Sequence, residues 1–135
     1  MLKGLLDKLN ANRRYTCAEK FVSENRYKEA LELLYDYEGP PLYVAKSVLL
    51  SAVAQHRNLD FKSAYKLYSK FLNFHINDIS RSNDRDYLEL YAKYFRDYAL
   101  KEFDQTTELC ISRNRLLELQ KRATLATRGE FPIID

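Results

Sequence analysis

Turn-forming residues are scarce in this sequence. Glycine and proline each occur three times in 135 residues, well below their usual shares of about 7% and 5%. Tight hairpin turns and phosphate-binding loops depend on these residues. The scarcity therefore disfavours hairpin-rich β folds and glycine-rich phosphate loops, and it favours a fold built from helices.

Cysteine and histidine are also rare. Cys17 and Cys110 lie far apart in the sequence, so they provide neither a disulfide framework nor a metal site. We expect both to be buried as small hydrophobic residues. His56 and His75 lack the spacing with further ligands that a metal site requires. The sequence predicts no metal site and no cofactor.

Long apolar runs and a strong charge bias are missing as well. No stretch approaches the roughly 18 apolar residues of a membrane-spanning helix, and residues 1–9 lack the apolar region of a signal peptide. The 22 basic and 19 acidic residues leave a formal net charge of +3, whereas dedicated nucleic-acid domains are usually more basic. We expect a single domain over residues 1–135, cytoplasmic and without membrane contact.

Apolar residues recur at helical spacing along most of the chain. Gly39 is expected to end one helix in a left-handed conformation, and Pro41 to begin the next. Asp60 is expected to cap a further helix. The pattern predicts an all-α fold of about six helices.

The same pattern divides the chain into segments. The pattern predicts two helical hairpins over residues 11–76 and a loop over the polar stretch 77–86. It predicts a longer helical hairpin over residues 87–128 and an extended tail over residues 129–135.

Alanines recur at a fixed period in the first two hairpins. Ala18 and Ala52 are 34 residues apart, and so are Ala30 and Ala64. An aromatic residue lies three positions before each alanine of the second pair. A period of 34 belongs to the tetratricopeptide repeat, and the region resembles such a repeat. The resemblance implies hairpins stacked as a short α-solenoid, although Tyr98 replaces the next alanine. An ordinary helical bundle remains the alternative.

Tyrosine is the most over-represented aromatic residue, with eleven occurrences and no tryptophan. Four of these tyrosines share one helical face, at positions 87, 91, 94 and 98. One interpretation places them in the core with their hydroxyls at its edge. The others make the face a surface for a partner protein, for a second copy of the chain or for single-stranded RNA.

The segment Ser112-Arg113-Asn114-Arg115 is similar to the start of the Arg-Asn motif of CRISPR-associated HEPN ribonucleases. That resemblance implies an RNA-associated helical domain. The motif needs a histidine five to seven residues after its arginine, and Glu118, Leu119 and Gln120 occupy those positions. No complete catalytic constellation is found, so an enzyme is the least supported class.

The first hypothesis is a non-catalytic helical-repeat module that binds a protein partner or assembles with itself. Aromatic side chains would anchor the partner and basic ones would steer it. An RNA-associated domain of a defence ribonuclease is the alternative. Candidate partner-binding residues are Tyr43, Lys46, Tyr65, Lys66, Tyr91 and Tyr94, and candidate anion or nucleic-acid ligands are Arg113, Arg115 and Arg122.

Overall fold

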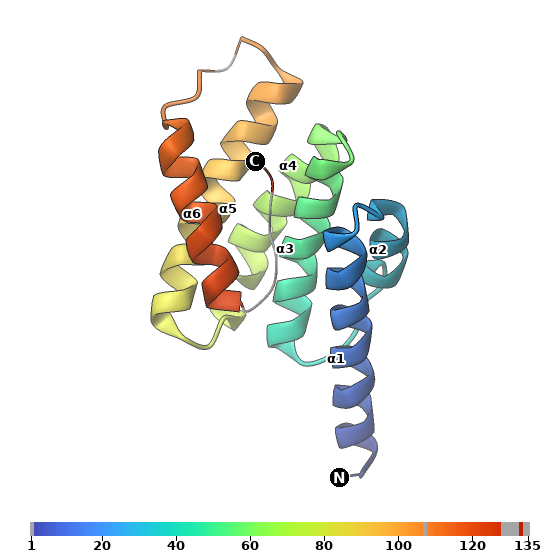
Figure 1. The fold of residues 1–135 in the computed structure, drawn as a ribbon. Helices are drawn as coiled ribbons and strands as arrows, with labels where there is room; N and C mark the ends of the chain where they lie inside the picture. Colours follow the sequence, from blue (N-terminus) through green and yellow to red (C-terminus); the bar gives the residue numbers. More distant parts are fainter. Residues whose placement is uncertain (1, 107, 128–132, 134–135) are drawn as a thin grey trace.

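The protein is all-helical over the residues that its computed structural model describes, which are 2–106, 108–127 and 133 (Figure 1). This confirms the prediction of an all-α fold with about six helices. A π-helical segment, Phe71–His75, and a 3₁₀ turn, Ile76–Asp78, extend the fourth helix. The six helices are α1 (Leu2–Ser23), α2 (Tyr27–Leu34), α3 (Pro41–Arg57), α4 (Phe61–Lys70), α5 (Ser82–Phe103) and α6 (Arg113–Thr127).

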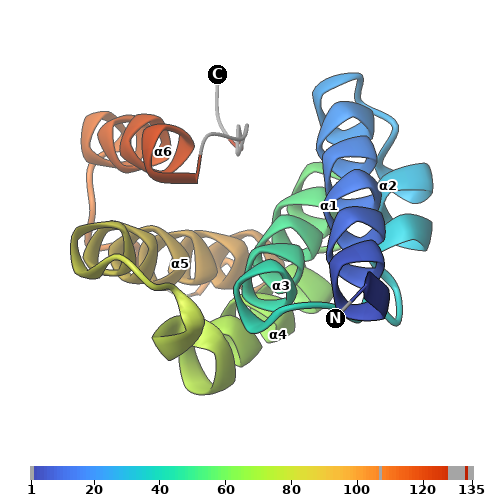
Figure 2. The ribbon, with the colours of Figure 1, turned by 90° about the horizontal axis from the view of Figure 1, so that it is seen from below.

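Each helix packs against the next one in the chain, and α1 also contacts α3. In Figure 2, α1 and α2 lie on one side of the molecule, α5 and α6 lie on the other, and α3 and α4 lie between them. The helices therefore form three consecutive antiparallel pairs.

The first two pairs turn in the same way. Asn25 and Leu59, which are 34 residues apart, both have a left-handed backbone, with φ of 62° and 65°. The following amide nitrogens bond to carbonyls five residues back, Arg26 to Phe21 at 2.8 Å and Asp60 to Gln55 at 2.9 Å. These bonds form the same helix-ending motif. The period seen in the alanines thus recurs in the backbone of both turns.

The left-handed backbone of Leu59 is unfavourable by roughly 1–2 kcal/mol, because its Cβ lies too close to the following carbonyl oxygen. Its side chain is 73% exposed, so little packing compensates. We expect Leu59→Asn to raise the free energy of unfolding by about 1 kcal/mol, since asparagine tolerates this conformation. Urea unfolding measures the change, and Leu59→Ala, which keeps the strain, is the control. Equal stabilities for the two variants would contradict the interpretation.

The helix boundaries follow the predicted signals at two positions. Pro41 begins α3, where its missing N–H is not needed. The Asp60 side chain caps α4 by accepting a hydrogen bond from the Ser63 amide at 3.2 Å.

Two other boundary predictions are wrong. The helix α2 ends at Leu34, and the left-handed residue that follows it is Asp36 rather than Gly39. The predicted loop 77–86 is shorter than expected, because α5 already begins at Ser82. Its polar residues form the first turns of that helix, where aspartate favours the positive end of the helix dipole.

The core runs through all six helices and includes all four periodic alanines, Ala18, Ala30, Ala52 and Ala64, each with no exposed surface. Methyl-sized side chains at these positions let neighbouring helices approach closely. Burial of these alanines is the geometry that the sequence predicts.

Both cysteines are exposed, so the prediction that they are buried is wrong. In α1 the buried positions are Ala11, Tyr15, Ala18 and Val22. This stripe leaves Cys17 on the outer face. Cys110 lies outside the helices, between α5 and α6.

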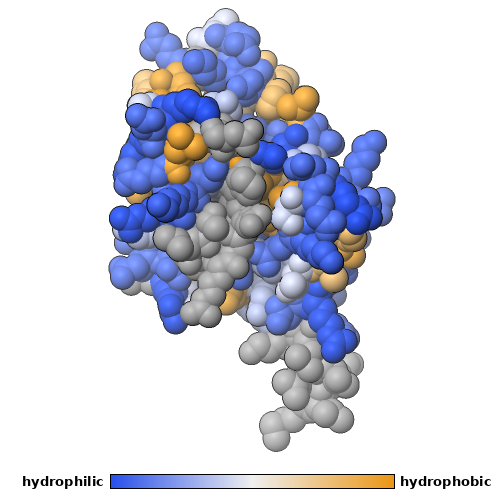
Figure 3. Space-filling view, viewed as in Figure 1, coloured by the Kyte–Doolittle hydropathy of each residue, from blue (hydrophilic) through white to orange (hydrophobic). Residues whose placement is uncertain are grey.

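The face shown in Figure 3 is mostly hydrophilic, with small and scattered hydrophobic patches. Among the described residues, no helix combines the length and the low polarity that crossing a bilayer requires. Of the predicted tail 129–135, only Ile133 is among the described residues, and it is partly buried against the core.

Candidate functional site

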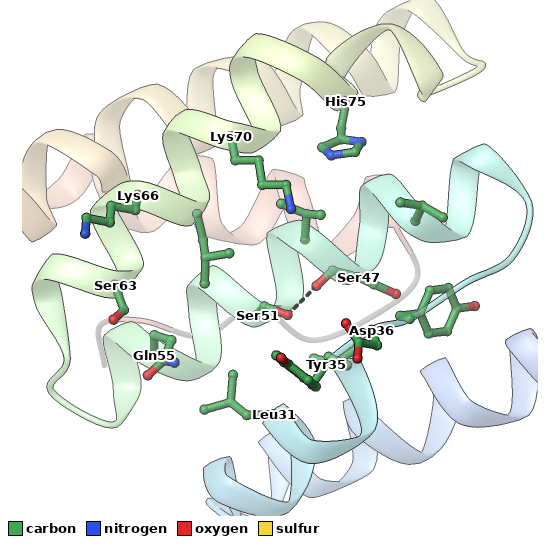
Figure 4. A pocket seen from close by; sticks show the side chains of 15 residues that line it. Leu31, Tyr35, Asp36, Ser47, Ser51, Gln55, Ser63, Lys66, Lys70 and His75 are labelled. Carbon is green, nitrogen blue, oxygen red and sulfur yellow. Dashed lines mark hydrogen bonds between the residues drawn. The ribbon is translucent and has the colours of Figure 1, made fainter.

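A groove of about 620 Å³ lies between α2, α3 and α4 (Figure 4). This volume is within the range of ligand-binding sites, about 300–1,000 Å³. Aliphatic side chains from all three helices form its apolar part: Leu31, Leu34, Val44, Val48 and Leu67. The groove can therefore bury apolar side chains of a ligand.

A polar row runs along α3 within the groove. Ser47, Ser51 and Gln55 follow one another at intervals of four residues, so they share one face of the helix. The Ser51 hydroxyl donates to the Ser47 carbonyl oxygen at 2.7 Å (Figure 4). That hydroxyl retains acceptor capacity, and the Gln55 amide can both donate and accept. Ser51 and Gln55 therefore offer hydrogen bonds to the backbone of an extended ligand, whereas the Ser47 hydroxyl is buried.

Positive charge lies along the α4 side of the groove. Lys66 and Lys70 are exposed, are one helical turn apart and line the groove (Figure 4). Neither forms an ion pair within the described part of the chain. His75 completes this side, and burial, with Lys70 nearby, lowers its pKa. At neutral pH the two lysines therefore carry the positive charge of this side.

An aromatic side chain stands on the opposite side of the groove. Tyr35 is 74% exposed and lines the groove together with Asp36. The Arg14 guanidinium holds this end of α2, because it donates to the carbonyl oxygens of Leu33 and Tyr35, the latter at 2.7 Å. Charged donors at a helix C-terminus satisfy its unpaired carbonyls. The Tyr35 backbone is thus fixed while its ring is free to contact a ligand.

The predicted partner-binding residues do not gather at one place. Lys66 lines the groove, whereas Tyr65, although on the same helix, does not. Tyr43 and Lys46 lie together near α1, where the Lys46 ammonium is 4.8 Å from the centre of the Tyr15 ring and 5.5 Å from that of Tyr43. Burial lowers the pKa of Lys46. This lysine is engaged within the fold.

The tyrosine face of α5 belongs to the core at its centre. Tyr91 has no exposed surface, so its assignment as a partner-binding residue is wrong. Its ring lies 4.6 Å from that of Phe95, centre to centre. Tyr94 is partly buried, with the Lys93 ammonium 5.7 Å from its ring centre. The other three tyrosines of this face, at positions 87, 94 and 98, are only partly buried. The buried side of α5 consists of Leu88, Tyr91, Ala92, Phe95 and Ala99.

The three arginines of α6 are engaged in different ways. Arg115 forms an ion pair with Glu118 at 3.1 Å. The Arg122 guanidinium lies 5.1 Å from the centre of the Tyr87 ring. Burial raises the pKa of the Tyr98 hydroxyl, and the positive charge of Arg113 offsets part of this rise.

The prediction missed Tyr35, Lys70 and the polar row of α3. A signal for the row was present, because three uncharged polar residues at intervals of four share one face of a largely apolar helix. The i, i+4 spacing of Lys66 and Lys70 was a second signal.

The described residues include no group of three or more His, Cys, Asp or Glu side chains that could hold a metal ion. The chain matches no protein-family model, no curated protein and no solved structure. The functional interpretation therefore rests on the geometry of the chain itself.

Proposed function

We propose that this protein is a helical-repeat binding module and that the groove between α2, α3 and α4 receives an extended acidic peptide from a partner protein. The observation that carries the proposal is the combination in one groove of an apolar lining, a polar row and two lysines without acidic partners. Apolar side chains of the peptide would fill the groove, and its carboxylates would face Lys66 and Lys70.

The repeat supports this architecture as part of the same proposal. The two hairpins share their turn geometry and their buried alanines at a period of 34 residues. Hairpins that repeat in this way stack as a short tetratricopeptide-like solenoid, and α5 and α6 cover its end. Stacked hairpins leave grooves between adjacent pairs, and the groove described above lies between the first pair and the second.

A protein partner is favoured over RNA by the contacts of the basic residues. Two of the three candidate arginines on α6 face a carboxylate or an aromatic ring of the chain itself, and acidic residues accompany the basic ones on α5. The two exposed thiols suit a reducing compartment, and we place the module in the cytoplasm on that ground.

A charge-reversal pair tests the proposal. Short randomised peptides displayed on phage are selected on the wild-type protein, and dissociation constants of the selected peptides are measured by fluorescence anisotropy. We expect acidic peptides with apolar anchors. Lys66→Glu/Lys70→Glu should weaken their binding at least about tenfold, because like charges across an interface repel.

The matched control is Lys28→Glu/Lys62→Glu. It makes the same change in charge on α2 and α4, at exposed lysines outside the groove. The control should bind the peptides as the wild type does. The proposal fails if both double variants lose affinity equally, or if selection yields only peptides without acidic residues. Retention of single-stranded RNA at low salt, unaffected by either variant, would favour the RNA-associated alternative.

A further inference from the structure

The groove between α2, α3 and α4 has three sides that differ in chemistry (Figure 4). Side chains of α2 and α4 lie on its opposite sides, and the polar row of α3 lies between them. The α4 side carries Lys66 and Lys70, whereas the α2 side carries Leu31, Tyr35 and Asp36. Positive charge on one side of the groove thus faces apolar side chains and a carboxylate on the other.

An extended peptide fits such a groove in a defined orientation. Its side chains point alternately to two opposite sides, and its backbone N–H and C=O groups point to the two edges between them. The backbone meets Ser51 and Gln55 only when one of these edges faces α3. The side chains then point alternately toward α4 and toward α2. Every second residue of the peptide therefore faces the lysines.

The spacing of the lysines agrees with this orientation. Lys66 and Lys70 are four residues apart, as are Ser51 and Gln55, so each pair is separated by about 6 Å along its helix. Side chains on one face of an extended chain repeat at a similar interval, about 6.6 Å. Two acidic residues separated by one other residue can therefore face both lysines while the backbone of the peptide stays in register with α3.

Asp36 disfavours other arrangements of the acidic residues. Its exposed carboxylate lies on the side of the groove opposite the lysines (Figure 4). In an extended peptide, two residues that are adjacent or three positions apart point to opposite sides. If both were acidic, one of them would face Asp36 instead of a lysine, and like charges across an interface repel.

We propose that the ligand of this groove is an extended segment in which acidic residues alternate with apolar ones. Two acidic side chains face Lys66 and Lys70, and the apolar side chains between them face Leu31 and Tyr35. The inference rests on the proposed function and adds the order of residues in the partner segment. Affinity then depends on that order as well as on the net charge of the ligand.

Three synthetic peptides of identical composition test the alternation, with acetylated and amidated ends that carry no charge. Ser-Leu-Glu-Leu-Glu-Leu-Ser has alternating glutamates, Ser-Leu-Glu-Glu-Leu-Leu-Ser has adjacent ones, and Ser-Glu-Leu-Leu-Glu-Leu-Ser has glutamates three positions apart. Their dissociation constants are measured by NMR titration. We expect the alternating peptide to bind about fivefold more tightly than either isomer, because each isomer exchanges an ion pair for repulsion by Asp36.

Asp36→Asn separates the effect of residue order from that of net charge. Asparagine tolerates the left-handed backbone of this position, where φ is 52°. The advantage of the alternating peptide should fall to about twofold in this variant, because the repulsion of the isomers is removed. Glu38→Gln is the matched control, since it removes the charge of an exposed carboxylate outside the groove. It should retain the fivefold advantage.

Equal affinities of the three peptides, or no binding of the alternating peptide, would overturn the inference. Tightest binding of the peptide with glutamates three positions apart would also overturn it, because such residues share a face in a helix and not in an extended chain. Lys66→Glu/Lys70→Glu separates these failures from that of the groove. If this variant still weakens binding of the phage-selected peptides, the groove stands and only the alternation fails. If it weakens no peptide, the proposed function fails as well.

Discussion

Replacing Phe95 with alanine is expected to lower the free energy of unfolding by about 3–5 kcal/mol, the usual cost of truncating a buried phenylalanine. Phe95 has no exposed surface. Its ring lies 4.6 Å from that of Tyr91, 6.3 Å from that of Tyr98 and 6.5 Å from that of His56. The side chain thus connects α5 to the second hairpin, and its loss leaves a cavity at that junction.

Chemical denaturation measures this loss, and Phe74→Ala is its control. Phe74 is 74% exposed, so its truncation should change stability by no more than about 0.5 kcal/mol. A Phe95→Ala variant as stable as Phe74→Ala would show that α5 does not pack on the second hairpin as described.

The second large effect is a dependence of stability on pH through His56. Burial, with a smaller contribution from the Arg57 charge, lowers the pKa of His56 from 6.5 to about 4. Between these values the unfolded chain binds a proton that the folded chain excludes, so stability rises with pH. The contribution is complete above pH 6.5 and is lost as the pH falls toward about 4. Its size is about 3 kcal/mol, from 1.36 kcal/mol per pKa unit.

Unfolding free energies of the wild type and of His56→Asn, measured from pH 7.5 to 4, test this expectation. Asparagine keeps a polar atom near the Tyr68 hydroxyl but does not titrate. The stability advantage of the wild type should shrink by about 3 kcal/mol over this range. His75→Asn is the control, and it should retain the steep loss because His56 is intact. Parallel profiles for the wild type and His56→Asn would mean that His56 titrates normally in the folded protein.

The helices could be predicted because their signals are local. Pro41 and Asp60 mark helix starts through their own chemistry, and the alanine period reflects contacts between adjacent helices. The prediction that Gly39 ends the helix is wrong because α2 ends five residues before it, with Asp36 in the left-handed position. A side chain that tolerates this conformation can end a helix without glycine.

The groove could be predicted only in part from the sequence, because its lining residues come from three helices. Lys66 was identified from the repeat, but its neighbours in the groove come from α2 and α3, and sequence spacing does not reveal their rotation relative to α4. Tyr91 and Tyr94 show the same limit. They share a helical face, yet only Tyr91 is fully buried, because burial depends on how the neighbouring helices pack around that face.

Photo-crosslinking tests most directly whether a partner peptide binds in the groove between α2, α3 and α4. A benzophenone amino acid replaces either Tyr35 or Phe74, two aromatic residues with the same exposed fraction of 74%, of which only Tyr35 lines the groove. With a selected acidic peptide, position 35 should give the crosslinked product and position 74 should not. Equal crosslinking at both positions, or crosslinking at position 74 alone, would contradict the claim.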